Sequence, residues 1–174
     1  MLKIIRFIIA HYMIFKRFQW GLKVLMTAKS TGKRIFVGGP TSVNGSTVLG
    51  EDFSTNGLVV RGSGSVHFGD YVHTGTDLLI ITSNHNYKNA KLLPYDERHE
   101  VKHIEIGRAV WIGDRVTILG GVSIGEGAII QAGSVVVTNI DKFSIAGGNP
   151  AKMFKYRDSE LYNKLADNDK FLKV

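Results

Sequence analysis

A repeat of six residues runs from Ile106 to Val136 and restricts the fold more than any other feature of the sequence. Large aliphatic side chains occupy every sixth position: Ile106, Ile112, Ile118, Ile124, Ile130 and Val136. Small or β-branched residues stand four positions after the first five of these: Val110, Val116, Val122, Ala128 and Ser134. An α-helix has a period near 3.6 residues and a flat strand a period of about 2, so neither explains this repeat.

A solenoid explains the repeat, because each segment of six residues can form one flat side and one corner of a triangular prism. Three sides make a coil of eighteen residues, in which each aliphatic side chain points inward and stacks on its copy in the next coil. Gly107, Gly113 and Gly125 each follow the aliphatic residue directly, where a corner favours a residue without a Cβ atom. The pattern therefore predicts a triangular prism of stacked coils.

The same period occurs earlier in the chain, with one shift of register. It is present at Val37, Val43 and Leu49, and it returns at Phe68, Thr74 and Ile80. Nineteen residues rather than eighteen separate Leu49 from Phe68, so one extra residue is expected between Ser54 and Gly64. A bulge of this kind is commonly without function, although it can also re-aim side chains at a site.

The repeat stops after His85 and resumes at Ile104. The segment 86–103 is too polar for a side of the prism, so we expect a loop that leaves the prism from one corner. Long loops in compact folds are commonly functional. His85 is expected at this corner, and His67, eighteen residues earlier, is expected to stack beside it in the neighbouring coil.

The N-terminal segment 1–26 is predicted to be an amphipathic helix. At 100° per residue, one half of its circumference is basic and contains Lys3, Arg6, Lys16, Arg17 and Lys23. The other half is apolar and contains Ile4, Phe7, Ile8, Ile14, Phe15, Phe18, Leu22 and Leu25. The apolar runs are too short to span a bilayer. Two interpretations stay open: the helix lies on an anionic membrane surface, or it packs on the prism or on a neighbouring subunit.

Charge and composition narrow the function classes. The net charge of +7 belongs to the N-terminal part, because residues 1–50 contain eight Lys or Arg and no Asp or Glu. The chain has no cysteine, which excludes disulfides, thiolate metal ligands and a cysteine nucleophile. It has no phosphate-binding loop or dinucleotide fingerprint, and we expect no nucleic-acid partner. At 174 residues it is long enough for one domain with a substantial core.

Three motifs resemble those of the hexapeptide-repeat acyltransferases: Ala109–Gly113, Gln131–Ser134 and Ala146–Lys152. The resemblance extends over roughly Val37 to Tyr156. It is strongest to the branch that contains the galactoside and maltose acetyltransferases and the polysaccharide O-acetyltransferases. It implies an all-β fold, a left-handed parallel β-helix, and a homotrimer whose active sites lie between subunits.

We therefore expect three parts in the chain. Residues 1–30 form the basic amphipathic helical segment, and residues 35–157 form the β-helix with its loop 86–103. Residues 158–174 form a short helix and a tail, for which Asp158 or Ser159 is a suitable N-cap. This last part is expected to cover the open end of the prism or to contact a neighbouring subunit.

The resemblance assigns catalysis to His85. In the family the catalytic histidine stands where a polar loop leaves a corner, and imidazole can accept and return a proton near neutral pH. A lone surface histidine is usually inert, so the assignment depends on this loop junction. The residues predicted to contact the acceptor are Asn56, Asn84 and Trp111, and Asn84 could also orient His85. Trp111 could instead pack against an adjacent subunit. A corner asparagine that tolerates positive φ is the structural alternative for Asn56.

The implied acyl donor is acetyl-coenzyme A, and no metal ion is expected. Small residues would let the pantetheine arm approach the backbone, and basic residues would meet the nucleotide phosphates. The residues that match family positions near the donor are Trp111, Gly113, Asp114, Ala132, Gly133, Thr138, Lys152 and Lys155. Asp114 stands where relatives often carry a small residue, and Asn139 stands where they often carry a lysine.

The predicted function is O-acetylation of a saccharide, a cell-surface polysaccharide or its lipid-linked precursor, by a cytoplasmic enzyme that is peripheral on the inner face of a membrane. Three alternatives stay open. An N-acetyltransferase acting on an amino sugar or an antibiotic would use the same histidine. A γ-class carbonic anhydrase would hold zinc through three histidines, for which His67, His73 and His85 match poorly in register. A solenoid without enzymatic activity would have no use for His85 and its loop.

Overall fold

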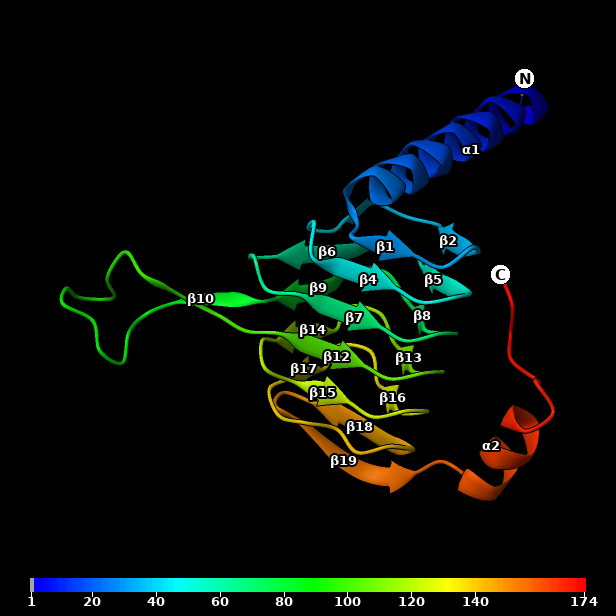
Figure 1. Cartoon of the computed structure of the whole chain (residues 1–174). Helices are drawn as coiled ribbons and strands as arrows, with labels where there is room; N and C mark the ends of the chain where they lie inside the picture. The colour runs from blue at the N-terminus through cyan, green and yellow to red at the C-terminus, as the bar shows by residue number, and fades with distance from the viewer. Residues whose placement is uncertain (1) are drawn as a thin grey trace.

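The computed structural model describes residues 2–174 and shows a triangular prism with a long helix at its N-terminal end (Figure 1). Helix α1 (Leu2–Thr27) leads into the first coil, and helix α2 (Ser159–Ala166) follows the last coil. A β-hairpin made of β10 (Ser83–His85) and β11 (His99–Val101) projects from the middle of the prism. Met1, the first residue of the predicted N-terminal helix, lies outside the described residues.

The three faces of the prism are sheets A, B and C, in which strands of successive coils pair in parallel. Sheet A contains β1 (Ser30–Thr31), β4 (Thr47–Leu49), β7 (Val66–Phe68), β12 (Ile104–Ile106) and β15 (Ser123–Ile124). Sheet B contains β2 (Ile35–Val37), β5 (Phe53–Thr55), β8 (His73–Thr74), β13 (Trp111–Ile112), β16 (Ile129–Ile130), β18 (Ser144–Gly148) and β19 (Ala151–Tyr156). Sheet C contains β3 (Thr41–Ser42), β6 (Leu58–Arg61), β9 (Leu78–Ile81), β14 (Thr117–Leu119) and β17 (Val135–Val136). Only the last pair of sheet B, β18 with β19, is antiparallel within these faces of the described chain.

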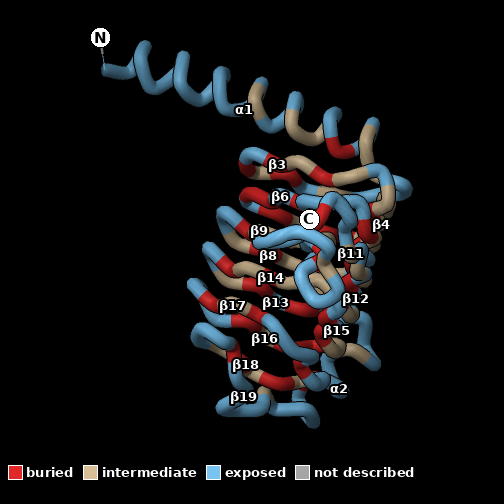
Figure 2. The backbone as a smooth tube through the Cα atoms, turned by 90° about the vertical axis from the view of Figure 1, so that its left-hand side faces the viewer, coloured by how far each residue is buried: buried red, intermediate tan, exposed pale blue. Residues whose placement is uncertain are grey.

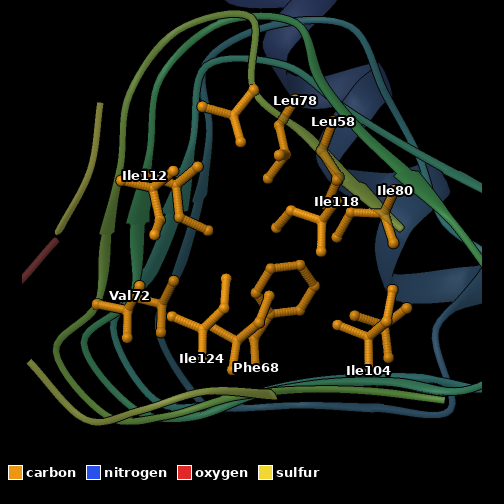
Figure 3. Close-up of a cluster of buried hydrophobic side chains, with 14 of the residues drawn as sticks. Leu58, Phe68, Val72, Leu78, Ile80, Ile104, Ile112, Ile118 and Ile124 are labelled. Atoms are coloured by element: carbon orange, nitrogen blue, oxygen red, sulfur yellow. The ribbon is translucent and has the colours of Figure 1, made fainter. Parts of the chain in front are cut away.

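The side chains predicted to point inward form the core of the prism. The six aliphatic residues of the repeat from Ile106 to Val136 are at most 2% exposed, and so are their companions four positions later. Figure 3 shows inward side chains from all three walls meeting in the middle of the prism. Phe53 and Phe68 meet edge to face in the N-terminal coils, with 4.9 Å between ring centroids. The predicted fold class, an all-β prism with helical ends and one long excursion, is confirmed.

Backbone hydrogen bonds run from coil to coil and hold the corners close together. The amide of Gly113 donates to the carbonyl of Ile130 at 2.8 Å. A Cβ atom on Gly113 would lie 2.6 Å from the backbone nitrogen of Ala132. This approach leaves no room for a side chain, which accounts for glycine at the predicted corner.

The register shift lies where the period predicts it, but it is the sum of two changes. Thr41 pairs with Leu58, seventeen residues later, so the corner before β6 is one residue short. Thr47 pairs with Val66, nineteen residues later, so the segment between β6 and β7 has two additional residues. That segment contains Gly62, whose φ of 92° suits a tight turn. One residue lost and two gained leave the predicted net shift of one.

The hairpin begins earlier than the predicted loop. Thr82 is buried and turns the corner, donating through Oγ1 to the carbonyl of Arg61 at 2.9 Å. Ser83–His85 then pair with His99–Val101 outside the prism. His85 therefore does not lie at the corner, as predicted, but at the end of the first hairpin strand. The reason is that the backbone of β10 finds its hydrogen-bond partners in the returning strand rather than in a neighbouring coil.

The inserted hairpin also changes the neighbour of His67. Sheet A resumes at β12, beyond the hairpin, so Glu105 lies beside His67 in the next coil. The Nδ1 atom of His67 and the Oε2 atom of Glu105 are 3.0 Å apart. The predicted stacking of His67 beside His85 is therefore wrong, because it assumed a coil of eighteen residues where the hairpin makes the spacing thirty-eight.

One buried carboxylate holds the tip of the hairpin in shape. Asp96 accepts hydrogen bonds from the side chains of Asn86 at 3.0 Å and Arg98 at 2.7 Å. It also accepts a hydrogen bond from the backbone amide of Lys91 at 3.2 Å. The bonds from the Arg98 guanidinium hold the pKa of Asp96 well below its usual range. The segment 86–98 is thus internally ordered although it projects from the prism (Figure 1).

Helix α1 contacts the prism only near its C-terminal end (Figure 2). Val24 is buried and Trp20 packs against the core, whereas residues 2–15 are all exposed. Packing on the prism, one of the two interpretations of this helix, therefore applies to the part from Arg17 to its end and not to its first turns. Within residues 2–174, no helix is both long enough and apolar enough to cross a membrane.

The C-terminal segment 157–174 runs back along the corner between sheets A and B, and we call it the strap. Near its start, Tyr162 donates a hydrogen bond to Glu126 at 2.8 Å, and burial raises the pKa of Tyr162 to about 12. At its end, the backbone amide of Val174 donates to Asp52 at 3.1 Å. The strap therefore lies along the side of the prism and not over its open end, because its anchoring partners stand at the corners of several coils.

Inward and outward neighbours on one strand should differ in their contribution to stability. Ile80 is fully buried, whereas the adjacent Leu79 faces outward. Ile80→Ala should lower the free energy of unfolding by about 2–5 kcal/mol, because it removes buried apolar surface and leaves a cavity. Leu79→Ala, the matched control, should cost less than about half as much. Denaturant unfolding measures both, and equal losses would contradict the inward position of Ile80.

Asp96→Asn should loosen the tip of the hairpin. A neutral amide leaves the Arg98 guanidinium without its ion pair and replaces one acceptor by a donor. Limited proteolysis should therefore cut the variant within residues 86–98 at least about tenfold faster than the wild type. Glu97→Gln, which neutralises the neighbouring exposed carboxylate, should be cut at the wild-type rate. If both variants were cut equally fast, the Asp96 network would not be what orders the tip.

Candidate active site

The corner between sheets B and C collects five of the predicted site residues in one column. Asn56 follows β5, Gly113 and Asp114 follow β13, and Ala132 and Gly133 stand just beyond β16. The amide of Gly133 donates to the carbonyl of Asp114 at 2.8 Å, which joins two levels of the column. All five residues except Gly113 are exposed. The structure thus brings these residues together along one edge of the prism.

Asp114 has a structural partner within this column. Its Oδ1 atom accepts a hydrogen bond from the backbone amide of Thr76 in the neighbouring coil at 2.7 Å. A Cβ atom on Gly75 would collide with the same oxygen. The carboxylate therefore closes the preceding corner, which gives a physical reason for an acid where the resemblance led us to expect a small residue.

Gly133 leaves the backbone accessible at the lower end of the column. Its φ is 73°, and no atom stands within 4 Å of the place where a Cβ would lie. Unlike Gly113, it is not required to be glycine by the approach of the next coil. An extended ligand could therefore reach main-chain groups beside Ala132 and Gly133.

A cleft of about 830 Å³ lies between sheet B and the strap. Trp111 stands on the sheet side at the start of β13, where its side chain is 59% exposed and points outward. Leu161 and Leu165 of α2 form part of the opposite wall. Asn56 and Asp114 also line the cleft, at the corner between sheets B and C. The cleft therefore combines an aromatic surface with polar groups at one edge, a combination common in ligand sites.

The outer wall of this cleft is the part that sequence reasoning missed. The ring of Phe171 stacks on that of Tyr71, with 4.3 Å between centroids and an angle of 8°. The guanidinium of Arg108 lies over the same Phe171 ring at 5.1 Å. The sequence predicted a short helix in this segment, but nothing in it indicated which face of the prism the helix would meet.

His85 presents an exposed imidazole on the hairpin. Its ring stacks on Tyr95, with 3.8 Å between centroids and an angle of 10°, and lies 4.5 Å from the ring of His99. Because Tyr95 stacks on a face of the His85 ring, this contact leaves the ring edge, with its two nitrogen atoms, uncovered for proton transfer. Asn84 lies beside Glu100 in the ladder. Adjacent strand residues point to opposite faces, so Asn84 is not placed to orient the His85 imidazole directly.

The predicted site residues fall into separate groups within one chain. The hairpin with His85 leaves the corner between sheets C and A, and Thr138 follows β17 at the same corner. The column that contains Asn56 lies across the full width of sheet C. Lys152 and Lys155 are exposed on β19, at the C-terminal end of sheet B. The structure of this chain therefore does not bring His85 to Asn56 or to the cleft.

The three histidines considered for zinc also stand apart in the structure of the chain. His67 lies on sheet A, His73 lies on sheet B with Nε2 3.3 Å from the carbonyl oxygen of Leu172, and His85 lies on the hairpin. Over residues 2–174, no group of three or more His, Asp or Glu side chains is arranged to hold a metal ion.

Comparison with known proteins places the repeat in a described family. Residues 103–138 match the bacterial transferase hexapeptide family (six repeats). Over 148 residues the chain is 33% identical to the putative lipopolysaccharide biosynthesis O-acetyl transferase WbbJ of Escherichia coli (strain K12), covering 67% of this chain and 75% of that protein. It is 56% identical over 55 residues to a probable macrolide acetyltransferase of Lysinibacillus sphaericus. That match covers 32% of this chain and only 31% of the relative.

The fold is shared with solved structures. A galactoside acetyltransferase in complex with coenzyme A matches with a TM-score of 0.70 and 25% identity, covering 80% of this chain and 70% of that one. This likeness agrees with the left-handed sense of the coil that the motifs implied. The match over three quarters of WbbJ, together with the hexapeptide match and the shared prism, shows that the chain belongs to the hexapeptide-repeat acyltransferases.

Proposed function

We propose that this protein transfers an acetyl group from acetyl-coenzyme A to a hydroxyl group of a saccharide, with His85 as the general base. The observation that carries the proposal is the exposed imidazole of His85, held by stacking on Tyr95 in an internally ordered hairpin. The relatives add support, since one is named for O-acetyl transfer in lipopolysaccharide biosynthesis and one was solved with coenzyme A bound.

The reaction requires one proton to move twice. The His85 imidazole takes the proton of the acceptor hydroxyl while the hydroxyl oxygen attacks the thioester carbonyl carbon. The carbon–sulfur bond then breaks, and the imidazolium gives its proton to the departing thiolate, which leaves as a thiol. Because the chain has no cysteine, this direct transfer is favoured over an acyl-enzyme on sulfur.

A second subunit completes the site in this proposal. In a homotrimer of side-by-side prisms, the hairpin of one subunit would reach the corner column and cleft of its neighbour. The amide of Asn56 can donate and accept a hydrogen bond at once, which suits an acceptor hydroxyl. Trp111 offers an aromatic face to a sugar ring or to the pantetheine arm. The separation of His85 from Asn56 within one chain is what calls for this arrangement.

The donor would bind along the accessible backbone of the column. Ala132 and Gly133 would meet the pantetheine arm, while Lys152 and Lys155 would pair with the nucleotide phosphates as point charges. The lack of a side chain at Gly113 is already explained by coil packing. Thr138 shares its corner with the hairpin, so it would approach the donor from the subunit that supplies His85.

For the acceptor we favour a cell-surface polysaccharide or its lipid-linked precursor, modified in the cytoplasm at the inner face of a membrane. The name of the WbbJ relative supports this class. A small antibiotic is the second candidate acceptor, favoured by the macrolide acetyltransferase relative over the shorter region it shares with this chain. Both acceptors would use His85 in the same role.

His85→Ala should lower turnover by at least about 100-fold, because it removes the general base. Release of free thiol from acetyl-coenzyme A, followed with a panel of saccharides and macrolides, measures the effect and identifies the acceptor class. Binding of coenzyme A and the unfolding midpoint should stay close to wild type. His67→Ala, which removes an exposed histidine on another face, should keep most of the activity. Full activity in His85→Ala would remove the proposed mechanism.

Prolonged treatment with a chelator should leave the activity unchanged, because the proposed transfer moves a proton and an acyl group without a metal ion. Elemental analysis of the purified protein should accordingly find no stoichiometric zinc. The result that would instead favour a carbonic-anhydrase-like site is about one zinc ion per subunit, lost together with the activity.

A further inference from the structure

The apolar face of α1 is fully formed but has no partner among residues 2–174. On a wheel of 100° per residue, an arc of about 120° contains ten residues of α1. One of the ten is His11. The other nine are large and apolar: Ile4, Phe7, Ile8, Ile14, Phe15, Phe18, Leu22, Leu25 and Met26. Their exposed fractions lie between 45% and 78%. A continuous apolar surface of this kind marks an interaction site.

The prism cannot cover this arc, because it contacts the other side of the helix. Trp20 and Val24 pack against the core, and the guanidinium of Arg17 lies over the ring of Phe36 at 5.8 Å. On the wheel these three residues fall on the half opposite the centre of the apolar arc. Figure 2 shows the N-terminal turns of α1 extending past the prism. The arc therefore faces away from the body of the protein.

The flanks of the arc carry only positive charge. Lys3 lies beyond one edge of the arc, and Lys23 and Lys16 lie beyond the other. Helix α1 has no acidic side chain, and the carboxylates that pair with Arg34, those of Glu51 and Asp52, belong to the following coil. Long lysine side chains can reach phosphate groups while the apolar side chains enter the layer below them.

A second copy of α1 fits this arc less well than lipid does. Helices that pair in water bury a narrow seam and place opposite charges at its flanks. Here the apolar arc is broad, and packing two copies together would bring flanking lysines into proximity without a carboxylate between them. Like charges at such positions oppose association.

We propose that α1 docks this protein on an anionic phospholipid surface, with its axis along the surface and its apolar arc embedded. Because the prism lies on the opposite side of α1, its first coils would face the bilayer and its last coils would point away from it (Figure 1). The hairpin with His85 then projects from the middle coils, at some distance from the lipid. The inference specifies how the enzyme is held at the membrane and depends on α1 alone, not on the acyl-transfer chemistry.

The test compares two double variants of equal composition and charge. Ile4→Glu with Ile8→Glu places two carboxylates in the apolar arc. Ile5→Glu with Ile9→Glu places them on the other half of the same exposed turns, at residues that are 46% and 55% exposed. Flotation of the full-length proteins with vesicles of phosphatidylcholine and phosphatidylglycerol, or of phosphatidylcholine alone, measures binding.

The wild type should float with the anionic vesicles and much less with the neutral ones. The arc variant should lose at least about tenfold of this binding, and the control variant should keep about half or more. Equal loss in both variants, or no flotation of the wild type, would overturn the proposal. A fall in oligomer mass of the arc variant alone, by light scattering without lipid, would assign the arc to a second copy instead. Acetyl transfer to a soluble acceptor should be unchanged in both variants, which separates this test from that of the proposed function.

Discussion

The stacking of equivalent side chains along the prism axis is the interaction on which the rest of the structure depends. Ile112 and Ile130 lie side by side in neighbouring coils, both almost fully buried, and the same relation recurs at each inward position. Backbone amides and carbonyls pair across the same coil-to-coil interface. Burial and backbone pairing therefore come from one repeat. Outward positions such as Trp111 are free of this requirement, so they can serve ligands without disturbing the core.

This division explains how much of the fold could be predicted from the sequence. The inward residues from Ile106 to Val136 were predicted one by one, because a period of six repeats the same environment. The shift near Gly62 was predicted only as its net value, since a period counts residues per coil and does not show where they are lost and gained. The course of the hairpin was misplaced at His85, because strands that pair with each other outside the prism follow no period of the coil.

The candidate site could likewise be predicted from the sequence only in part. Asp114 and Ala132 could be placed in one column from the sequence, because eighteen residues, the length of one coil, separate them. Asn56 could not be added to that column, because the register shift and the inserted hairpin lie between Asn56 and Asp114. The neighbour of His67 could not be predicted from the sequence, because the length of the inserted hairpin decides that Glu105 lies beside it. A motif match also does not distinguish a residue that binds a ligand from one that holds the fold. Asp114 matches a family position near the donor, but its carboxylate closes a corner by accepting a hydrogen bond from Thr76. The cleft wall depends on contacts such as Phe171 with Tyr71, which join distant parts of the chain without any local pattern.

The strap has a consequence for how the prism comes apart. In an array whose units contact only their nearest neighbours, an end unit can detach while the others persist, and melting spreads stepwise. The strap contacts Glu126 in a late coil and Asp52 in an early one. The strap therefore links early and late coils that do not touch each other. Detaching the coil at either end also breaks one of the strap's contacts. This link favours unfolding of the prism as one cooperative unit over stepwise melting from its ends.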